Sequence, residues 1–138
     1  MSLNTIRAAI EGRIATEFAA SPVIPVAYQN VPFSPPNNSS FIQAFVGFGD
    51  QAYLTLLAPA TGMNRVNGAL TVNIFTPRGV GPGANLTIAQ RVINLFSRLT
   101  LQNINFDAAN GPNAIATAAP EGFYQTQVTI TFEAFEQS

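Results

Sequence analysis

A long run of alternating residues limits the folds open to this chain more than any other feature. The run extends from Val66 to Thr76, and an extended backbone there places the apolar side chains of Leu70, Val72 and Ile74 on one face. Ala69, Thr71, Asn73 and Phe75 fall on the other face. A strand with one core-facing side is typical of antiparallel sheets, whereas parallel strands are usually apolar on both faces.

Two other segments have helical periodicity. Apolar residues three and four positions apart predict a helix from Leu3 to Ala19, with a buried stripe of Leu3, Ile6, Ile10, Ile14 and Phe18. A second helix is expected from Leu86 to Leu99, with Asn85 as its N-cap and an apolar stripe of Ala89, Val92, Ile93 and Phe96. Arg91 and Arg98 are seven residues apart, so they are expected to share one outward face.

The remaining segments read as strands and loops. Phe41–Phe48 is apolar on both faces, and Gln51–Leu57 is expected to pair with it across a tight turn at Gly49-Asp50. Other strands are expected at Val26–Tyr28, Leu101–Phe106 and Phe123–Phe135, and residues 107–122 give a weak strand at best. In the last strand Tyr124, Val128, Ile130 and Phe132 face inward, and Gln125, Gln127, Thr129, Thr131 and Glu133 face outward. Residues 31–40 and 58–65 are expected to be loops.

This order of elements predicts the fold class. Helix, strands, helix and strands in succession favour an α+β fold, a mainly antiparallel sheet with the two helices packed on one face. The chain of 138 residues is long enough for one domain, and no internal repeat or second domain is visible. We therefore expect a single domain over residues 1–138.

The scarcity of charge points to assembly. The chain has six basic residues, all arginine, and seven acidic residues, so charged residues make up 9%, against about 25% in a typical soluble domain. A monomer in water needs a charged, mixed surface. Low charge and the two-sided apolar run Phe41–Phe48 therefore predict a closed homo-oligomer. No apolar run is long enough to span a bilayer and no basic cluster suits an anionic membrane, so no membrane partner is expected.

The same composition argues against an enzyme. The chain contains no histidine and no cysteine, which removes the usual general base, the thiolate nucleophile and the soft metal ligands. The acidic residues are scattered and have no metal-ligand spacing. We expect no catalytic residues, no metal and no cofactor.

One motif keeps an alternative of a different class open. Gly79-x-Gly81-x-x-Ala84 lies between a strand and a helix and matches a relaxed dinucleotide fingerprint, with Asp107 downstream as a possible ribose ligand. Pro82 removes one donor from such a phosphate cradle, and the alternating strand before it is unlike a parallel one. The preferred interpretation is a strand-to-helix turn in which Gly79, Gly81 and Gly83 supply backbone freedom. Gly81→Val is expected to disrupt folding or the approach to a neighbour.

Four features of the sequence follow one another along nearly the whole chain. The amphipathic helix at Leu3–Ala19 comes first, and Pro25–Phe33 reads P-V-A-Y-Q-N-V-P-F. Arg65–Gly81 reads R-V-x-G-x-L-x-V-x-I-F-x-P-x-G-x-G and precedes a helix rich in small residues, and the last strand ends in F-E-A at Phe132–Ala134. In this order they resemble the phage tail terminator-like proteins. The resemblance implies an α+β subunit of a hexameric ring on the head-proximal end of the tail tube. The ring stops tube polymerisation and offers a docking surface to the head or neck connector.

The resemblance also implies the partners and the location: the tail tube protein, a connector or neck protein, and a virion assembled in the host cytoplasm. Another small head-tail joining protein is the first alternative. Phe33 and Met63, in the loops 31–40 and 58–65, are expected to contact neighbouring proteins, because solvated loops do not need apolar side chains. Arg65 and Arg78, at the ends of the long strand, are candidates to line a DNA passage through the ring. Arg91 and Arg98 are expected to make intersubunit or surface ion pairs.

Overall fold

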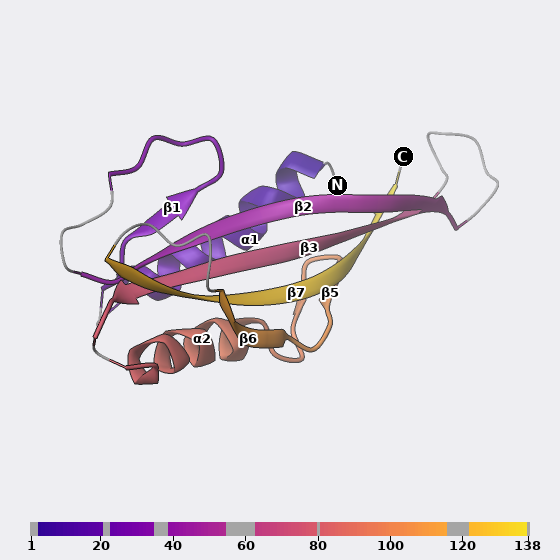
Figure 1. Ribbon diagram of the computed structural model, residues 1–138. Coiled ribbons are helices and arrows are strands. Elements are labelled where there is room, and N and C mark those ends of the chain that lie inside the picture. Colours follow the sequence, from indigo (N-terminus) through magenta and orange to yellow (C-terminus); the bar gives the residue numbers. More distant parts are fainter. Residues whose placement is uncertain are drawn as a thin grey trace.

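One sheet with two helices on one face forms the fold (Figure 1). The structure, a computed structural model, describes residues 3–20, 23–34, 39–54, 63–79, 81–115 and 122–137. The elements in chain order are α1 (Leu3–Ala19), β1 (Val26–Tyr28), β2 (Phe41–Tyr53), β3 (Met63–Pro77), α2 (Gly83–Phe96), β4 (Thr100–Leu101), β5 (Ile104–Phe106), β6 (Asn110–Ile115) and β7 (Phe123–Gln137). The α+β class is confirmed.

The sheet is antiparallel except at one edge. Its strand order is β1-β2-β3-β7-β5-β4, and β6 pairs with β7 off this path. Only β1 runs parallel to its neighbour, β2. The long strands β2, β3 and β7 form the centre of the sheet. At one end of the sheet their ends, which pair with one another, form a projecting arm (Figure 1).

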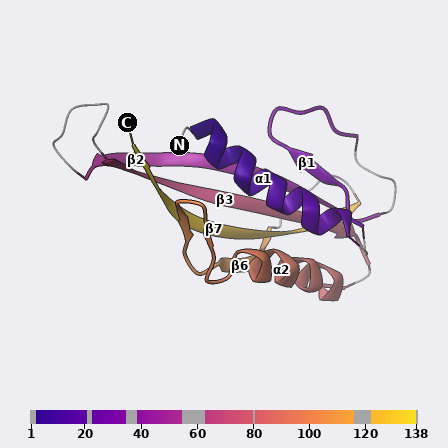
Figure 2. The same cartoon turned by 180° about the vertical axis from the view of Figure 1, so that it is seen from behind.

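The core lies between the helices and one face of the central strands. The register aligns Ile42 with Ile74 and Leu70 with Ile130, so the inward side chains of three strands form continuous rows. The helix α1 lies behind the strands in Figure 1 and in front of them in Figure 2. The helices contribute Ile6, Ile10, Ile14, Phe18, Ile88, Ala89, Val92 and Phe96 to this core. Both predicted helical stripes are therefore buried as expected, apart from the exposed Leu3 and the half-buried Ile93.

The predicted tight turn at Gly49-Asp50 is wrong. The strand β2 continues from Phe41 to Tyr53, and its partner throughout is β3. The register moves from Phe48 opposite Gly68 to Gln51 opposite Val66, so β2 takes up an extra residue in a bulge. This bulge accommodates the Gly49-Asp50 dipeptide, because β3 is long enough to pair with β2 on both sides of it. Residues 55–57 of the predicted partner strand lie outside the described residues.

Several boundaries also differ from the prediction. Met63, Asn64 and Arg65 belong to β3 and not to a loop. The segment predicted as one strand, Leu101–Phe106, is a hairpin of β4 and β5, because Gln102 takes a positive φ of 55° between them. The weak strand expected in residues 107–122 is β6, which lies against β7. Gln125 lies on the predicted outward face, beside Phe75 in the register, but it is only 5% exposed.

Asn85 does not cap the second helix. The helix begins at Gly83 with Pro82 at the N-cap, and no side chain caps it. Asn85 is fully buried within the first turn, where its Nδ2 donates to the Ile74 carbonyl at 3.2 Å and to the Tyr124 carbonyl at 3.3 Å. The Asn85 side chain also contacts the hydroxyls of Thr76 and Thr126. Asn85 therefore ties α2 to β3 and β7, a role that its position one turn before Ala89 on the buried stripe makes possible.

Candidate functional site

The end of the sheet where β3 passes into α2 contains a cavity of about 660 Å³. Its lining includes Pro77, Ile115, Phe123 and the predicted turn glycines Gly79 and Gly81. These glycines have φ values of 91° and 81°, which other residues rarely adopt. A Cβ atom at Gly81 would meet nothing within 4 Å, so a substitution there acts through backbone strain and leaves space in the cavity.

Polar groups in this cavity are few. The Arg78 main chain donates to the Gly122 carbonyl at 2.9 Å, and the Arg78 Nε donates to the Phe123 carbonyl at 3.1 Å. These two bonds fasten the end of β3 to the start of β7. Gln125 also lines the cavity, and its Oε1 is buried without a hydrogen-bond partner in the described part of the chain.

The opposite end of the sheet is the projecting arm, formed by the ends of β2, β3 and β7. Tyr53 is 82% exposed, Leu54 46% and Met63 36%. The edge strand β1 pairs only with Ile42–Ala44 of β2, and within the described ranges no other strand covers the outer edge of β2 beyond that point. The arm therefore combines exposed apolar side chains with unpaired backbone groups, which are features of a protein-binding edge.

The face of the sheet opposite the helices carries amide side chains. Asn73 Nδ2 donates to Gln43 Oε1 at 3.4 Å, and Gln127 Nε2 donates to Asn73 Oδ1 at 3.0 Å, so one row of amides crosses three strands. At one end of this face the rings of Phe41 and Phe75 stack with 4.7 Å between centroids. The ring of Phe33 lies 5.4 Å from that of Phe41. Phe33, expected to contact a neighbour, is thus half-buried against its own sheet and keeps part of its surface free.

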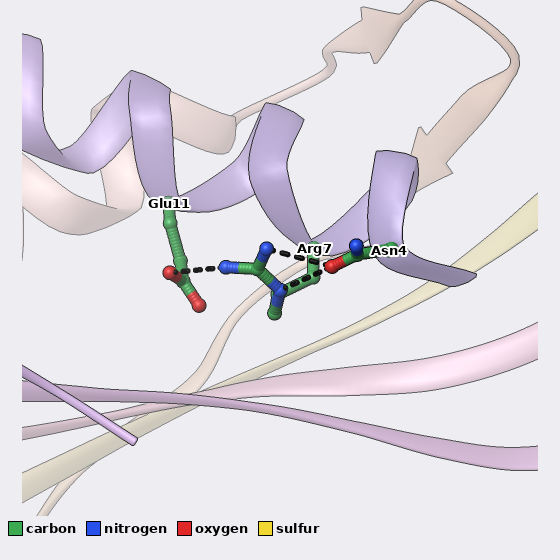
Figure 3. A network of polar contacts seen from close by, with 3 residues as sticks. All are labelled: Asn4, Arg7 and Glu11. Atoms are coloured by element: carbon green, nitrogen blue, oxygen red, sulfur yellow. Dashed lines mark hydrogen bonds and ion pairs between the residues drawn. The ribbon is translucent and has the colours of Figure 1, made fainter. Parts of the chain in front are cut away.

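The six arginines fall into two groups. On the surface of α1, Arg7 Nη1 lies 2.8 Å from Glu11 Oε1, and Asn4 accepts two further hydrogen bonds from the same guanidinium (Figure 3). Arg13 donates to the Leu95 carbonyl, and Arg91 pairs with Glu17. The expectation that Arg91 faces outward is wrong, because its guanidinium lies between the helices and over the Phe18 ring.

The other three arginines make no ion pair within the described residues. Arg65 is half-buried between Ala52 and Phe135 in the sheet register, and its Nε is buried without a hydrogen-bond partner in that part of the chain. Arg78 and Arg98 are exposed, and Arg98 follows the end of α2 with a φ of 51°. Arg65 lies on β3 and Arg78 follows its last residue, thirteen positions later. This is roughly 40 Å at about 3.3 Å per residue, so the structure does not bring these two candidates together.

The glycine motif does not lie in a dinucleotide-binding unit. The strand before it, β3, runs antiparallel to both neighbours, β2 and β7. A dinucleotide fingerprint needs a parallel strand, helix and strand in succession. Where residues are described, no three side chains of the metal-ligating kind come together, and no helix is long and apolar enough to cross a membrane.

Comparison with known proteins identifies the family. The family model described as phage tail terminator protein matches residues 5–132. The chain belongs to the phage tail terminator family. A solved structure also superimposes on it with a TM-score of 0.71 at 22% identity, over 97% of this chain and 96% of the other, which shows a shared fold. No curated protein matches the chain.

Membership of the tail terminator family fixes the general role. The chain is a structural protein of the phage tail, a component of the virion that interacts with other tail or head proteins. For such a protein, the features that matter are surfaces and not reactive groups. The cavity with Gln125 and the exposed Tyr53 were not found from the sequence.

Proposed function

We propose that this protein forms a ring of six copies that caps the head-proximal end of the tail tube. The ring stops tube polymerisation by covering the surface that the next tube ring would use, and it presents its other side to the head or neck connector. The family match carries the proposal, and the number six comes from the family resemblance.

Two features of the chain support assembly into a ring. Charged residues make up 9% of the sequence, which is low for a surface facing water on all sides. The arm at one end and the cavity at the other are different surfaces on one subunit, and contacts between different surfaces generate rings when the rotation closes. No bond is made or broken in this mechanism, because capping is stoichiometric.

The proposal is tested by following polymerisation of the purified tube protein with and without this chain. Added protein should shorten the tubes in proportion to its concentration, and native mass spectrometry should give a complex of six copies. Phages that lack the gene should produce overlong tubes. Tubes of unchanged length in both experiments would contradict the proposal. A chain that binds the connector without affecting tube length would instead be another head-tail joining protein.

DNA passage through the ring is a further part of the proposed function. One arginine per subunit repeats around the axis, so even a net-acidic chain can have a locally basic bore. Arg65 and Arg78 are the candidates for this role, because they lie near the two ends of the long strand β3 and have no ion pair within the described residues. Arg65→Glu and Arg78→Glu should leave tail length unchanged and reduce DNA delivery, whereas Arg98→Glu serves as the control. Normal infectivity of both variants would exclude DNA contact, and altered tail length would place these arginines at the tube.

A further inference from the structure

The cavity at the β3–α2 turn needs an occupant with a particular chemistry. Most of its wall is apolar, with Pro77, Ile115 and Phe123 among the lining residues. Its volume of about 660 Å³ is within the range of about 300–1,000 Å³ that binds small ligands or side chains. Gln125 lines it, is 5% exposed, and has an Oε1 atom without a hydrogen-bond partner in the described residues. A buried polar atom left unpaired is unfavourable, so an apolar group with one hydroxyl or amide would complete the site once the Gln125 side chain turns its amide toward the cavity.

The arm of the same protein carries a group of that chemistry. Tyr53 has an aromatic body and a hydroxyl, and at 82% exposure it is far more open to solvent than most aromatic side chains. Leu54 beside it is 46% exposed. A tyrosine hydroxyl both donates and accepts hydrogen bonds, so it satisfies the Gln125 amide in either orientation of that amide.

The Tyr53 side chain of a subunit cannot reach the cavity of that same subunit. The register places Tyr53 opposite Asn64 at one end of β3, and Ala114 of the cavity wall beside Thr126 and hence Ile74 near the other end. These rows are ten residues apart along β3, roughly 30 Å at about 3.3 Å per residue. Figure 1 shows the arm and the β3–α2 turn at opposite ends of the sheet.

We infer that Tyr53 and Leu54 at the arm of one copy occupy the cavity beside Gln125 in the next copy. The Tyr53 ring lies against the apolar wall, its hydroxyl bonds to the Gln125 side chain, and Leu54 fills the space near Ala114. The contact joins two different surfaces, so it repeats head to tail and closes into a ring. The inference rests on the proposed ring and assigns the residues that hold it together.

Disulfide cross-linking tests this contact directly, because the natural sequence has no cysteine. The double variant Leu54→Cys with Ala114→Cys places one thiol on the arm and one on the cavity wall. A disulfide needs Cα atoms within about 7 Å, so these two thiols cannot bond within one chain. Oxidation of the assembled protein should therefore give a ladder of covalent oligomers on a non-reducing gel. The matched control, Leu54→Cys with Leu86→Cys, moves the second thiol to an exposed site on α2 outside the cavity.

Two results would overturn the inference: assembled protein that gives no ladder, or a control pair that cross-links equally well. A second variant tests the hydroxyl. Tyr53→Phe keeps the ring and should weaken subunit association about tenfold, as expected for leaving one buried polar group unpaired, and Tyr53→Ala should weaken it further. Association of both variants at wild-type strength would also overturn it.

The failure of this inference is distinguishable from failure of the proposed function. If wild-type protein neither forms a ring nor stops tube growth, the proposed function is wrong. If it does both, and the Leu54–Ala114 pair remains uncross-linked in the ring, only the assigned contact is wrong.

Discussion

The Arg91 Nη2 atom lies 2.9 Å from the Glu17 carboxylate Oε2 and so joins α2 to α1. The same nitrogen donates to the Glu17 main-chain carbonyl at 2.8 Å, and the guanidinium carbon lies 4.4 Å from the centroid of the Phe18 ring. One side chain thus combines an ion pair, a hydrogen bond to the end of α1 and a cation–π contact. An arginine supplies all three because its planar guanidinium has several donors and an apolar face.

Arg91→Leu should lower the free energy of unfolding by about 1–3 kcal/mol. The loss is smaller than for a fully buried ion pair, because solvent screens the half-exposed carboxylate of Glu17. Urea denaturation followed by circular dichroism measures the change. Arg98→Leu is the matched control, since Arg98 is exposed and makes no ion pair in the described residues, and it should change stability by less than about 0.5 kcal/mol. Equal effects of the two substitutions would show that the contact between the helices is not stabilising.

Asn85→Ala should destabilise the subunit by about 2–3 kcal/mol, because the carbonyls of Ile74 and Tyr124 lose a buried donor and a small cavity remains. The measurement is thermal unfolding in the calorimeter. Asn94→Ala, on the exposed side of the same helix, removes an amide without burial and serves as control. Loss of stability in the control alone would contradict the assigned role of Asn85.

Gly68→Ala should destabilise the sheet by about 1–3 kcal/mol through overpacking. A Cβ atom at Gly68 would lie 2.4 Å from Cζ of Phe132 and 2.6 Å from the Gly47 carbonyl oxygen, closer than non-bonded atoms tolerate. Gly12→Ala is the opposite case: the site is helical and nothing lies within 4 Å of the added carbon, so stability should rise by about 0.5–1 kcal/mol. Denaturant midpoints for both variants check the signs, and a neutral Gly68→Ala would show that the strands yield at this contact.

Periodicity was sufficient to predict the elements that bury one face against the core. The helix from Leu3 to Ala19 and the strand from Val26 to Tyr28 have the predicted bounds. Both long strands, β3 and β7, are present because alternation over many residues specifies an extended backbone and its buried side at once. Such patterns are local and repeat several times, so one exceptional residue does not conceal them.

Features that depend on tertiary pairing were not predictable in the same way. Gly49-Asp50 has the composition of a turn, and only the length of β3 makes it a bulge. Asparagine is a common residue at helix N-caps. Asn85 is instead buried because its side chain donates hydrogen bonds to the Ile74 and Tyr124 carbonyls of two strands. The cavity beside Gln125 is formed by three separate segments of the chain, within residues 77–82, 114–115 and 123–125, so no single segment of sequence contains its signature.

Alkaline pH should destabilise the subunit through Tyr28. Burial raises the pKa of Tyr28 above its usual value of about 10, and the nearby Glu11 carboxylate raises it further. The folded state therefore holds the phenol proton more tightly than the unfolded chain. The resulting stabilisation is present below pH 10 and is lost as the pH rises from about 10 through the folded-state pKa. Tyr28→Phe should make the alkaline decline of unfolding free energy shallower. Tyr53→Phe, at a side chain that is 82% exposed, is the matched control, with both variants measured as dissociated subunits so that its effect on association does not enter. An unchanged slope in Tyr28→Phe would show that this phenol does not contribute.

Phe33→Ser should weaken ring assembly and leave the monomer folded. The Phe33 ring packs against Phe41 at 5.4 Å between centroids but remains only half-buried. Losing this aromatic pair should lower the unfolding free energy by about 0.5–1.5 kcal/mol, too little to unfold a domain of this size. The exposed part of the ring is available to a neighbouring protein, so its removal should raise the concentration needed for assembly in light-scattering measurements. Val31→Ser, at a position that is 55% exposed in the same segment, is the control. An unfolded Phe33→Ser protein would place Phe33 in the core, whereas normal assembly of a folded variant would exclude it from the subunit contact.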